Sequence, residues 1–314
     1  MISIKDLQFF YKEKMILNIN NLNLDTKKIS ILTGINGSGK STLLRILAFL
    51  EGDFSRNITY FGKNRLSLEE KRRIYLLLPD PILLNRNVKD NFYFALKTYN
   101  IKENWDESIQ KALKLLDLDK NLLKKNTHEL SSGQIRKISL AIALSIKARY
   151  YLLDEPSAFL DKNTLFLFKK ALLEIQKERK NGFLIVSHDK NFLDDLAQTK
   201  FYLHDGKILE FENINIFDLD KNIIEFSNLL YFKTKAQKIA INPYKIKLGN
   251  HLEFHIKQAK IIALRIKKEF VFIRVTSGNK ILEFALKNED FQKLPLKLYQ
   301  NIELSFDEEA IYFI

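Results

Sequence analysis

The chain has 314 residues, a formal net charge of +13 and no cysteine, which excludes a disulfide scaffold, a cysteine-ligated zinc site and a thiol nucleophile. Hydrophobic residues make up 46 % and charged residues 28 % of the chain, as expected for a folded protein long enough for two domains. No uncharged apolar run is long enough to span a bilayer, and charges in the first twenty residues exclude a secretory signal, so we expect a cytoplasmic protein.

The N-terminal part of the chain alternates buried strands with amphipathic helices. Continuous apolar runs predict strands at Ile29–Leu32, Tyr150–Leu153 and Phe183–Val186. Leucines at helical spacing predict a helix over Ser41–Leu50, and a second periodic segment predicts one over Thr164–Lys180. This alternation indicates an α/β domain with a mostly parallel sheet.

The pattern changes near residue 213. Residues 213–232 are expected to be connecting helix and loop, and many short, evenly spaced strands follow, which indicates a small barrel or sandwich. The expected strands are 252–256, 272–275, 281–286, 302–306 and 311–314, with turns at 277–279, 287–290 and 307–309. We therefore predict a first domain over residues 1–230, a linker at about 213–235 and a small β domain over 236–314.

Glycine is scarce, with 10 residues, yet Gly34, Gly37 and Gly39 lie close together. They belong to Gly34–Ser41, which fits G-x-x-x-x-G-K-[ST] between a predicted strand and a predicted helix. Glycines there let backbone N–H groups surround phosphates at a helix N-terminus. Lys40 is expected to reach the β- and γ-phosphates, and Ser41 to ligate Mg²⁺. The residues expected around the nucleotide are Gly34, Asn36, Gly37, Ser38, Gly39, Lys40, Ser41 and Thr42.

Four further motifs follow in a fixed order. They are Leu130–Gln134 (LSSGQ), Tyr151–Pro156 (YLLDEP), Ser157–Asp161 (SAFLD) and Ser187–Asp189 (SHD). With the phosphate loop, this ordered set resembles the nucleotide-binding subunits of ATP-binding-cassette (ABC) transporters over about residues 1–230. The resemblance implies a P-loop NTPase fold that hydrolyses ATP with Mg²⁺.

The resemblance assigns roles to single residues. Asp154, at a strand end, is expected to hold Mg²⁺ largely through water, and Glu155 is the candidate general base. His188 is similar to the family's switch histidine, which contacts the γ-phosphate, and completes the catalytic set with Lys40. Tyr11 is expected to stack on adenine, although the neighbouring Phe9 and Phe10 leave its register open.

A second group of residues resembles the family's signature segment. Ser131, Gly133 and Gln134 are expected to meet the nucleotide of a second copy of the chain, and Asp161 to lie at that interface. Because one chain holds one phosphate loop and one signature, the resemblance implies a head-to-tail homodimer.

Two positions depart from the family pattern. Ser132 replaces the first signature glycine, and Pro79 stands where the family has a glutamine that touches Mg²⁺, the attacking water and the membrane partner. Asp80 is a candidate substitute oxygen ligand. Hydrolysis is then expected to be slow or differently coupled, but the chain is still predicted to be an active ATPase.

The tail also carries a family resemblance. Ile241–Leu248 and Asn301–Ile311 resemble the start and end of the small OB-like (TOBE) domain of some importer ATPases for oxyanions, sugars, ferric iron and polyamines. The Ser-Ala-Arg-Asn segment that can carry the anion in related molybdate domains is absent. A regulatory or dimer-stabilising role is therefore favoured over an anion site.

The whole chain is similar to ATPases of tungstate or molybdate importers, with sulfate, ferric iron, polyamine or sugar as alternative cargoes. The resemblance implies integral membrane permease subunits docked at a groove within residues 79–94, a separate extracytoplasmic solute-binding protein, and a place on the inner face of the membrane. A soluble ABC-type regulator, an ATPase acting on nucleic acid and a module that signals without hydrolysis remain alternatives. The first 212 residues carry a net +9 and the rest +4, so the charge is spread evenly and no nucleic-acid partner is expected.

Overall fold

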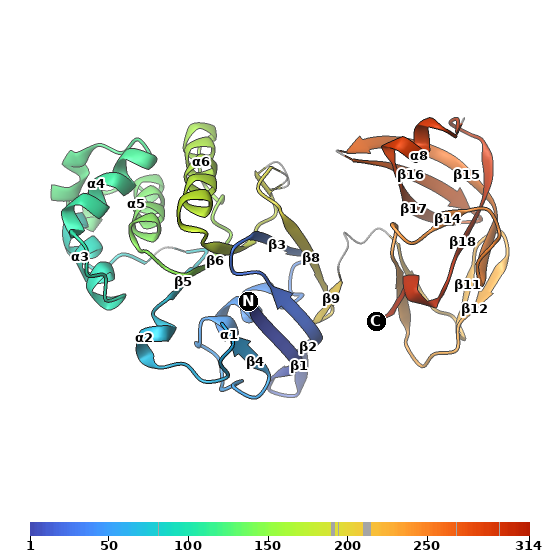
Figure 1. Ribbon diagram of the computed structural model, residues 1–314, viewed down its shortest axis with the longest axis horizontal. Coiled ribbons are helices and arrows are strands. Elements are labelled where there is room, and N and C mark those ends of the chain that lie inside the picture. The colour runs from blue at the N-terminus through green and yellow to red at the C-terminus, as the bar shows by residue number, and fades with distance from the viewer. Residues whose placement is uncertain (81, 190–191, 194, 210–214, 268, 295) are drawn as a thin grey trace. The chain divides into compact units, whose positions relative to one another are not determined.

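The computed structural model describes residues 1–80, 82–189, 192–193, 195–209, 215–267, 269–294 and 296–314. The chain divides into two compact units, Met1–Glu210 and Phe211–Ile314, which are described separately (Figure 1). Within these described ranges, no helix is both long and apolar enough to cross a membrane.

A six-stranded sheet forms the centre of the first unit. Its order is β5 (Ile74–Leu77), β6 (Tyr150–Asp154), β7 (Gly182–Val186), β3 (Ile29–Gly34), β8 (Thr199–His204) and β9 (Lys207–Leu209). Every neighbouring pair is parallel except β8 with β9. The mostly parallel sheet and the three strands predicted for this unit are confirmed.

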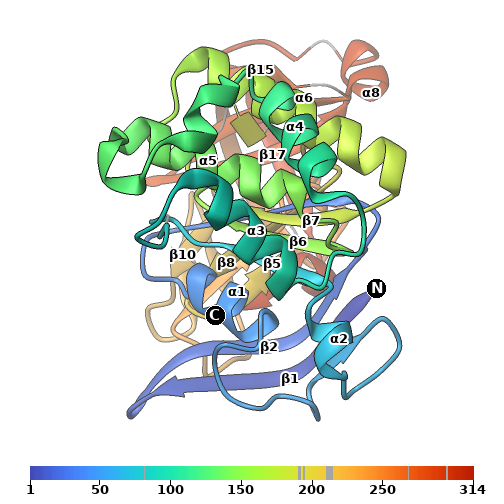
Figure 2. The same ribbon diagram turned by 90° about the vertical axis from the view of Figure 1, so that its left-hand side faces the viewer.

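Both faces of this sheet are buried, which explains its continuous apolar strands. Ile31 and Leu153 face a core shared with helices on one side, whereas Leu32 and Leu152 face the opposite core. The first side holds α3 (Val88–Thr98), α4 (Trp105–Leu115), α5 (Ser132–Ser145) and α6 (Lys162–Arg179), with short 3₁₀ turns at Lys120–Lys124 and Thr127–Glu129. The second side holds α1 (Lys40–Leu47) and a β2-β1-β4 antiparallel sheet made of Lys14–Leu24, Ile2–Tyr11 and Ile58–Tyr60. Figures 1 and 2 show helices α3–α5 and the β1–β2 hairpin on opposite sides of the parallel sheet, and α2 (Leu68–Lys71) near the hairpin.

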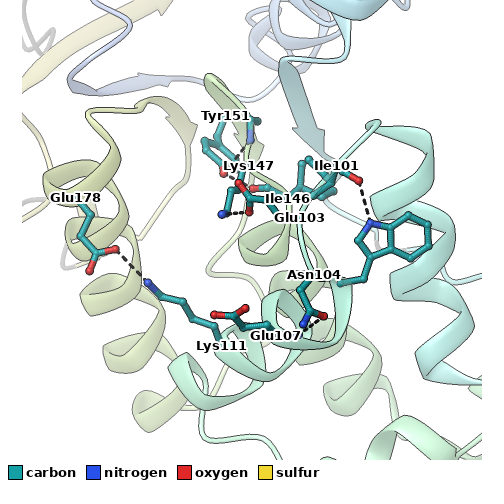
Figure 3. Close-up of polar contacts among 11 residues, drawn as sticks. Ile101, Glu103, Asn104, Glu107, Lys111, Ile146, Lys147, Tyr151 and Glu178 are labelled. Atoms are coloured by element: carbon teal, nitrogen blue, oxygen red, sulfur yellow. Dashed lines mark hydrogen bonds and ion pairs between the residues drawn. The ribbon is translucent and has the colours of Figure 1, made fainter.

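Polar contacts join the helices to each other and to β6 (Figure 3). Asn104 caps α4 by accepting from the Glu107 amide at 3.4 Å. Lys111 of α4 pairs with Glu178 of α6 at 3.1 Å, and Lys147 pairs with Glu103. These ion pairs are partly exposed, so each contributes at most about 1 kcal/mol and packing holds the layer together.

The described part of the second unit is all-β apart from two short helical turns, α8 (Asn288–Gln292) and a 3₁₀ turn at Glu308–Ala310. One sheet has the order β10-β13-β19, from Ile216–Asp218, Lys238–Ile241 and Ile311–Phe313. A five-stranded sheet runs β14-β18-β15-β16-β17, from Lys247–Leu248, Asn301–Phe306, Phe254–Lys267, Phe270–Ser277 and Lys280–Lys287. A hairpin of β11 (Ile223–Glu225) and β12 (Leu229–Tyr231) completes the unit.

The boundary between the units lies earlier than the predicted linker. Residues 216–231 contain three short strands and the turns between them rather than the expected connecting helix and loop, because Phe217 and Ile224 are buried in the core of the second unit. Residues 213–214 lie outside the described part of the chain. The predicted turn at 287–290 is likewise replaced by the start of α8.

Candidate active site

Four neighbouring strands of the parallel sheet end at one edge, and the predicted site residues follow them. The phosphate loop follows β3, Glu155 follows β6, His188 follows β7 and Pro79 follows β5. The register places Asp154 beside Val186, which in turn lies beside Leu32 of β3. The carboxyl edge of an open α/β sheet is where such folds bind ligands.

The phosphate loop needs its glycines for different reasons. A β-carbon on Gly34 would lie 2.2 Å from the Leu203 carbonyl oxygen, so close packing excludes any side chain. Gly39 is the N-cap of α1 with φ +101, and a β-carbon there would lie 2.7 Å from Leu17. Gly37 has φ +79 with open space around it, so only its backbone conformation and the approach of another molecule favour glycine.

The loop folds back on its own lysine. Lys40 is 7 % exposed, and its Nζ donates to the carbonyl oxygens of Gly34 and Ile35, each at 2.9 Å. Burial lowers the pKa of Lys40, and the nearby carboxylates of Glu155 and Asp154 oppose that shift. Asn36 and Ser41 are exposed and Thr42 is half-buried. The buried Ser38 hydroxyl has no hydrogen-bond partner among the described residues.

Two oxygen-bearing side chains meet at the start of α1 and the end of β6. Asp154 is 3 % exposed and hydrogen-bonded to Ser41. Burial raises the pKa of Asp154, and the hydrogen bond from Ser41 and the cations Arg45 and Lys40 oppose the shift. Among the described residues, no group of three or more His, Cys, Asp or Glu side chains could hold a metal alone. The Ser41 hydroxyl and the Asp154 carboxylate are oxygen ligands of the kind that Mg²⁺ prefers.

The two catalytic candidates contact each other directly. Glu155 Oε1 lies 3.3 Å from His188 Nε2, and Glu155 Oε2 accepts from the His188 amide at 3.3 Å. Glu155 has φ +47, a strained backbone conformation for this residue type, and its amide donates to the Val186 carbonyl at 2.8 Å. A third contact joins the same two loops, because the hydroxyls of Ser157 and Ser187 lie 2.7 Å apart.

Arg136 is a site residue that the sequence did not single out. It is 2 % exposed, and its guanidinium donates to the carbonyl oxygens of Leu78, Pro79 and Glu155. Burial lowers its pKa, and the carboxylates of Asp80, Asp154 and Glu155 oppose this shift. The available signal was an arginine two residues after Gln134, but a helix pattern alone does not show which carbonyls such a side chain reaches.

The signature segment forms the start of α5. Ser131 Oγ accepts from the Gln134 amide at 3.2 Å, and Gln134 Oε1 accepts from the Ser131 amide at 3.0 Å, which makes a capping box. A β-carbon on Gly133 would meet nothing within 4 Å. No neighbour among the described residues therefore requires a glycine at position 133.

Other predicted residues lie apart from this centre. Asp161 caps α6, accepting from the Thr164 amide at 2.8 Å, and its Oδ2 lies 2.7 Å from Lys137 Nζ. Tyr11 ends β1 and is 67 % exposed, whereas Phe9 packs against Phe54 with ring centroids 6.1 Å apart.

Among the described residues, no hydrogen bond or ion pair of Asp80 supports its predicted metal role. Asp80 is exposed, and its carboxylate interacts electrostatically with the Arg136 guanidinium. The assigned roles of Tyr11, Asp80 and the signature residues stay predictions.

Comparison with known proteins shows to which family the chain belongs. Residues 17–158 match the family described as ABC transporter. The chain is 56 % identical, over 100 % of both chains, to the tungstate uptake system ATP-binding protein TupC of Campylobacter jejuni subsp. jejuni serotype O:2. The chain belongs to the ATP-binding proteins of ABC transporters, and as such it is an ATPase.

A second tungstate uptake system ATP-binding protein, from Peptoclostridium acidaminophilum, is 30 % identical over 67 % of this chain and 97 % of its own length. The fold is shared with a solved ATP-binding subunit of an ABC transporter, at a TM-score of 0.61 and 23 % identity over 66 % of this chain and 87 % of that one.

Proposed function

We propose that this protein is the ATP-binding subunit of a tungstate uptake system, located at the cytoplasmic face of the membrane. The observation that carries the proposal is the 56 % identity, over the whole of both chains, to the TupC protein of Campylobacter jejuni. A match confined to the phosphate loop and its motifs would indicate ATP use alone, whereas this one includes the all-β unit and every loop between.

The proposed roles in hydrolysis rest on the family resemblance, and the strand-end geometry supports them. Lys40 and the backbone amides of the phosphate loop bind the β- and γ-phosphates, and His188 contacts the γ-phosphate. Glu155 is the general base, and the contact of its carboxylate with His188 at 3.3 Å places both groups at one point of the site. Tyr11 is exposed at the end of β1 and provides the surface on which the adenine ring of ATP stacks.

Mg²⁺ belongs to the proposal as well. Ser41 and Asp154 already lie within hydrogen-bond reach of each other, and both side chains present the oxygen atoms that Mg²⁺ prefers. When bound, the ion neutralises charge that develops on the phosphate oxygens. Asp80 remains a further candidate ligand for this ion.

Two copies of the chain work head to tail in this proposal. The open space at Gly133 and the N-terminus of α5 leave a face on which the nucleotide of a second copy can lie. Ser131 keeps its hydroxyl proton for that nucleotide, because the capping box uses the oxygen as an acceptor. Permease subunits dock near residues 79–94, where Ile82 is 81 % exposed and Phe94 49 % exposed. A separate extracytoplasmic protein delivers the solute.

The second unit is proposed to be a TOBE-like module with a regulatory or dimer-stabilising role. The tungstate uptake relative from Peptoclostridium acidaminophilum aligns over 97 % of its length with 67 % of this chain. A protein with the same named function therefore has almost no length left to match the remaining third of this chain, so that third is not needed to define the cargo.

The test is substrate-stimulated ATPase activity of the complete system. The chain, its permease subunits and the solute-binding protein are reconstituted in vesicles, and ATP hydrolysis is measured with tungstate, molybdate or sulfate at equal concentration. We expect tungstate to stimulate most strongly. Stimulation by sulfate without tungstate would replace the cargo assignment, and tight salt-resistant binding of RNA or DNA in place of permease association would replace the importer assignment.

A further inference from the structure

Arg136 bridges the ends of two parallel strands. Its Nη1 donates to the Leu78 carbonyl at 3.2 Å and to the Pro79 carbonyl at 2.7 Å, both just beyond β5. Its Nη2 donates to the Glu155 carbonyl just beyond β6. The side chain reaches both loops because long helical side chains project toward the helix N-terminus, here from the second turn of α5.

Packing alone does not account for this arginine. A buried guanidinium loses its hydration, and an apolar side chain of similar volume would fill the same space without that cost. Arg136 is among the largest fully buried side chains of the chain, and its Nε has no partner among the described residues. Its hydrogen bonds go to main-chain carbonyls of two separate loops. A guanidinium suits this arrangement because its N–H donors are held in a rigid planar group.

The contact at Pro79 has a specific meaning. A proline offers neither a side-chain donor or acceptor nor a backbone N–H, so its carbonyl is its one polar group. That carbonyl is the closer of the two Nη1 acceptors. Any hydrogen-bonded link between position 79 and the catalytic centre must therefore use this oxygen.

Further along, Leu84 is held equally firmly. Its amide donates to Asn91 Oδ1 at 2.8 Å, and its carbonyl accepts from Asn91 Nδ2 at 3.1 Å. Asn91 is 4 % exposed on α3, and Thr127 Oγ1 donates to the same carbonyl at 3.3 Å. Pro79 and Leu84 are thus fixed points, and the strongly exposed Ile82 lies between them in sequence.

The other end of the Arg136 bridge is the main chain of Glu155, which sets the direction of the candidate base. The Glu155 carbonyl accepts from Arg136 and from the Ala158 amide, and its amide donates to Val186. With φ at +47, the direction of the carboxylate depends on these main-chain bonds.

We propose that Arg136 is a positioning residue, which holds the main chain of Glu155 to the main chain of Leu78 and Pro79 and so links the permease-facing segment to the general base. This inference deepens the proposed function: the predicted effect on permease coupling rests on that function. The predicted effect on hydrolysis rests only on the ATPase activity of the chain. A main-chain link through Arg136 takes the place of the side-chain link that Pro79 cannot make.

The experiment compares Arg136→Lys and Arg136→Gln with the wild-type full chain. Lysine keeps the charge but has one nitrogen, which cannot span carbonyls of two loops. We expect kcat to fall roughly 10- to 100-fold, with KM and the ATP dissociation constant changed less than about threefold, because a misplaced base costs turnover rather than binding. The control is Arg149→Lys. Arg149 precedes β6 directly, and its guanidinium lies 3.9 Å from the ring centre of Phe61, away from the site, so this variant should keep wild-type turnover.

Two further measurements separate positioning from structural support. In the Glu155→Gln background, Arg136→Lys should add no further loss in single-turnover hydrolysis, whereas independent structural damage would add to it. Pro79→Gln should restore part of the turnover lost in Arg136→Gln, because it returns a polar side chain to this segment. Unchanged kcat in Arg136→Lys, or parallel losses of ATP affinity and thermal stability without rescue, would overturn the inference.

The permease arm is measured separately. In vesicles with the permease subunits, the ratio of stimulated to basal hydrolysis should fall in both Arg136 variants and stay unchanged in Arg149→Lys. If tungstate does not stimulate hydrolysis in the wild-type system, the proposed cargo is wrong. The basal kcat values of the Arg136 variants would still decide the role of Arg136.

Discussion

Glu155 and His188 restrain each other from neighbouring strand ends. The carboxylate lies 3.3 Å from the imidazole Nε2, and its second oxygen accepts from the His188 amide at 3.3 Å. The candidate base is therefore aimed by the residue that the family resemblance places on the γ-phosphate. In the proposed mechanism, a bound γ-phosphate would compete with Glu155 for the imidazole, so we expect ATP binding to change the position of the carboxylate.

Replacing the candidate base tests the core of this arrangement. Glu155→Gln keeps the shape of the side chain but removes its capacity to accept a proton. We expect turnover to fall roughly 100- to 10,000-fold while ATP binding stays intact. Steady-state hydrolysis and nucleotide titration measure the two effects, with Glu178→Gln, paired to Lys111 on the helical side, as the matched control. Unchanged hydrolysis in Glu155→Gln would refute the assignment.

The glycines of the phosphate loop should fail in different ways. Gly34→Ala places a β-carbon 2.2 Å from the Leu203 carbonyl, so we expect the free energy of unfolding to fall by roughly 2–5 kcal/mol. Gly37→Ala meets no atom within 4 Å and should cost only about 1–2 kcal/mol for its positive φ.

For Gly37→Ala the larger loss should be in ATP affinity, because the methyl group enters the space that the phosphates need. Chemical denaturation and nucleotide titration of the two variants give the comparison. Equal losses of stability in both would contradict the close-packing argument for Gly34.

The parts of the site that follow local rules were predictable from the sequence. The phosphate loop is a contiguous motif, and Asp154 and Glu155 stand directly after a continuous apolar strand, so parallel strands had to bring them to one edge. The helix over 164–180 was also expected, because its apolar positions repeat at helical spacing.

The parts that depend on side-chain reach or on partners distant in sequence could not be predicted. Arg136 crosses to carbonyls 57 and 19 residues away, and periodicity carries no information about such contacts. The strands between residues 216 and 231 are only three residues long each, too short for an alternating pattern, and pairing partners such as Ala240 define them.

The cap of α6 gives a prediction on stability and pH. The hydrogen bond from Lys137, with those from Thr164, holds the pKa of Asp161 below its usual range. A lowered pKa means that the ionised carboxylate stabilises the fold above its unfolded-state pKa, and that this stabilisation is lost as the pH falls through roughly 4 and below.

Asp161→Asn keeps a good N-cap and should cost less than about 1 kcal/mol at neutral pH, while Asp161→Ala should cost about 0.5–2 kcal/mol. Thermal unfolding between neutral and acid pH measures this. The difference between wild type and Asp161→Asn should shrink toward acid pH, and a difference that grows there would contradict the Lys137 pairing.

Removing the second unit tests which part of the chain carries the activity. Unit Met1–Glu210 contains both hydrophobic cores around the parallel sheet and all the site residues, so a chain of residues 1–212 should fold by itself. We expect it to bind ATP as the full chain does and to hydrolyse it within a few-fold of the full-length rate in the presence of the permease subunits.

The contribution of the β unit should appear instead in the concentration at which two copies associate, measured by sedimentation of the Glu155→Gln form with ATP. Loss of ATP binding in the shortened but folded chain would show that the β unit supports the nucleotide site directly, which contradicts its proposed role as a regulatory or dimer-stabilising module.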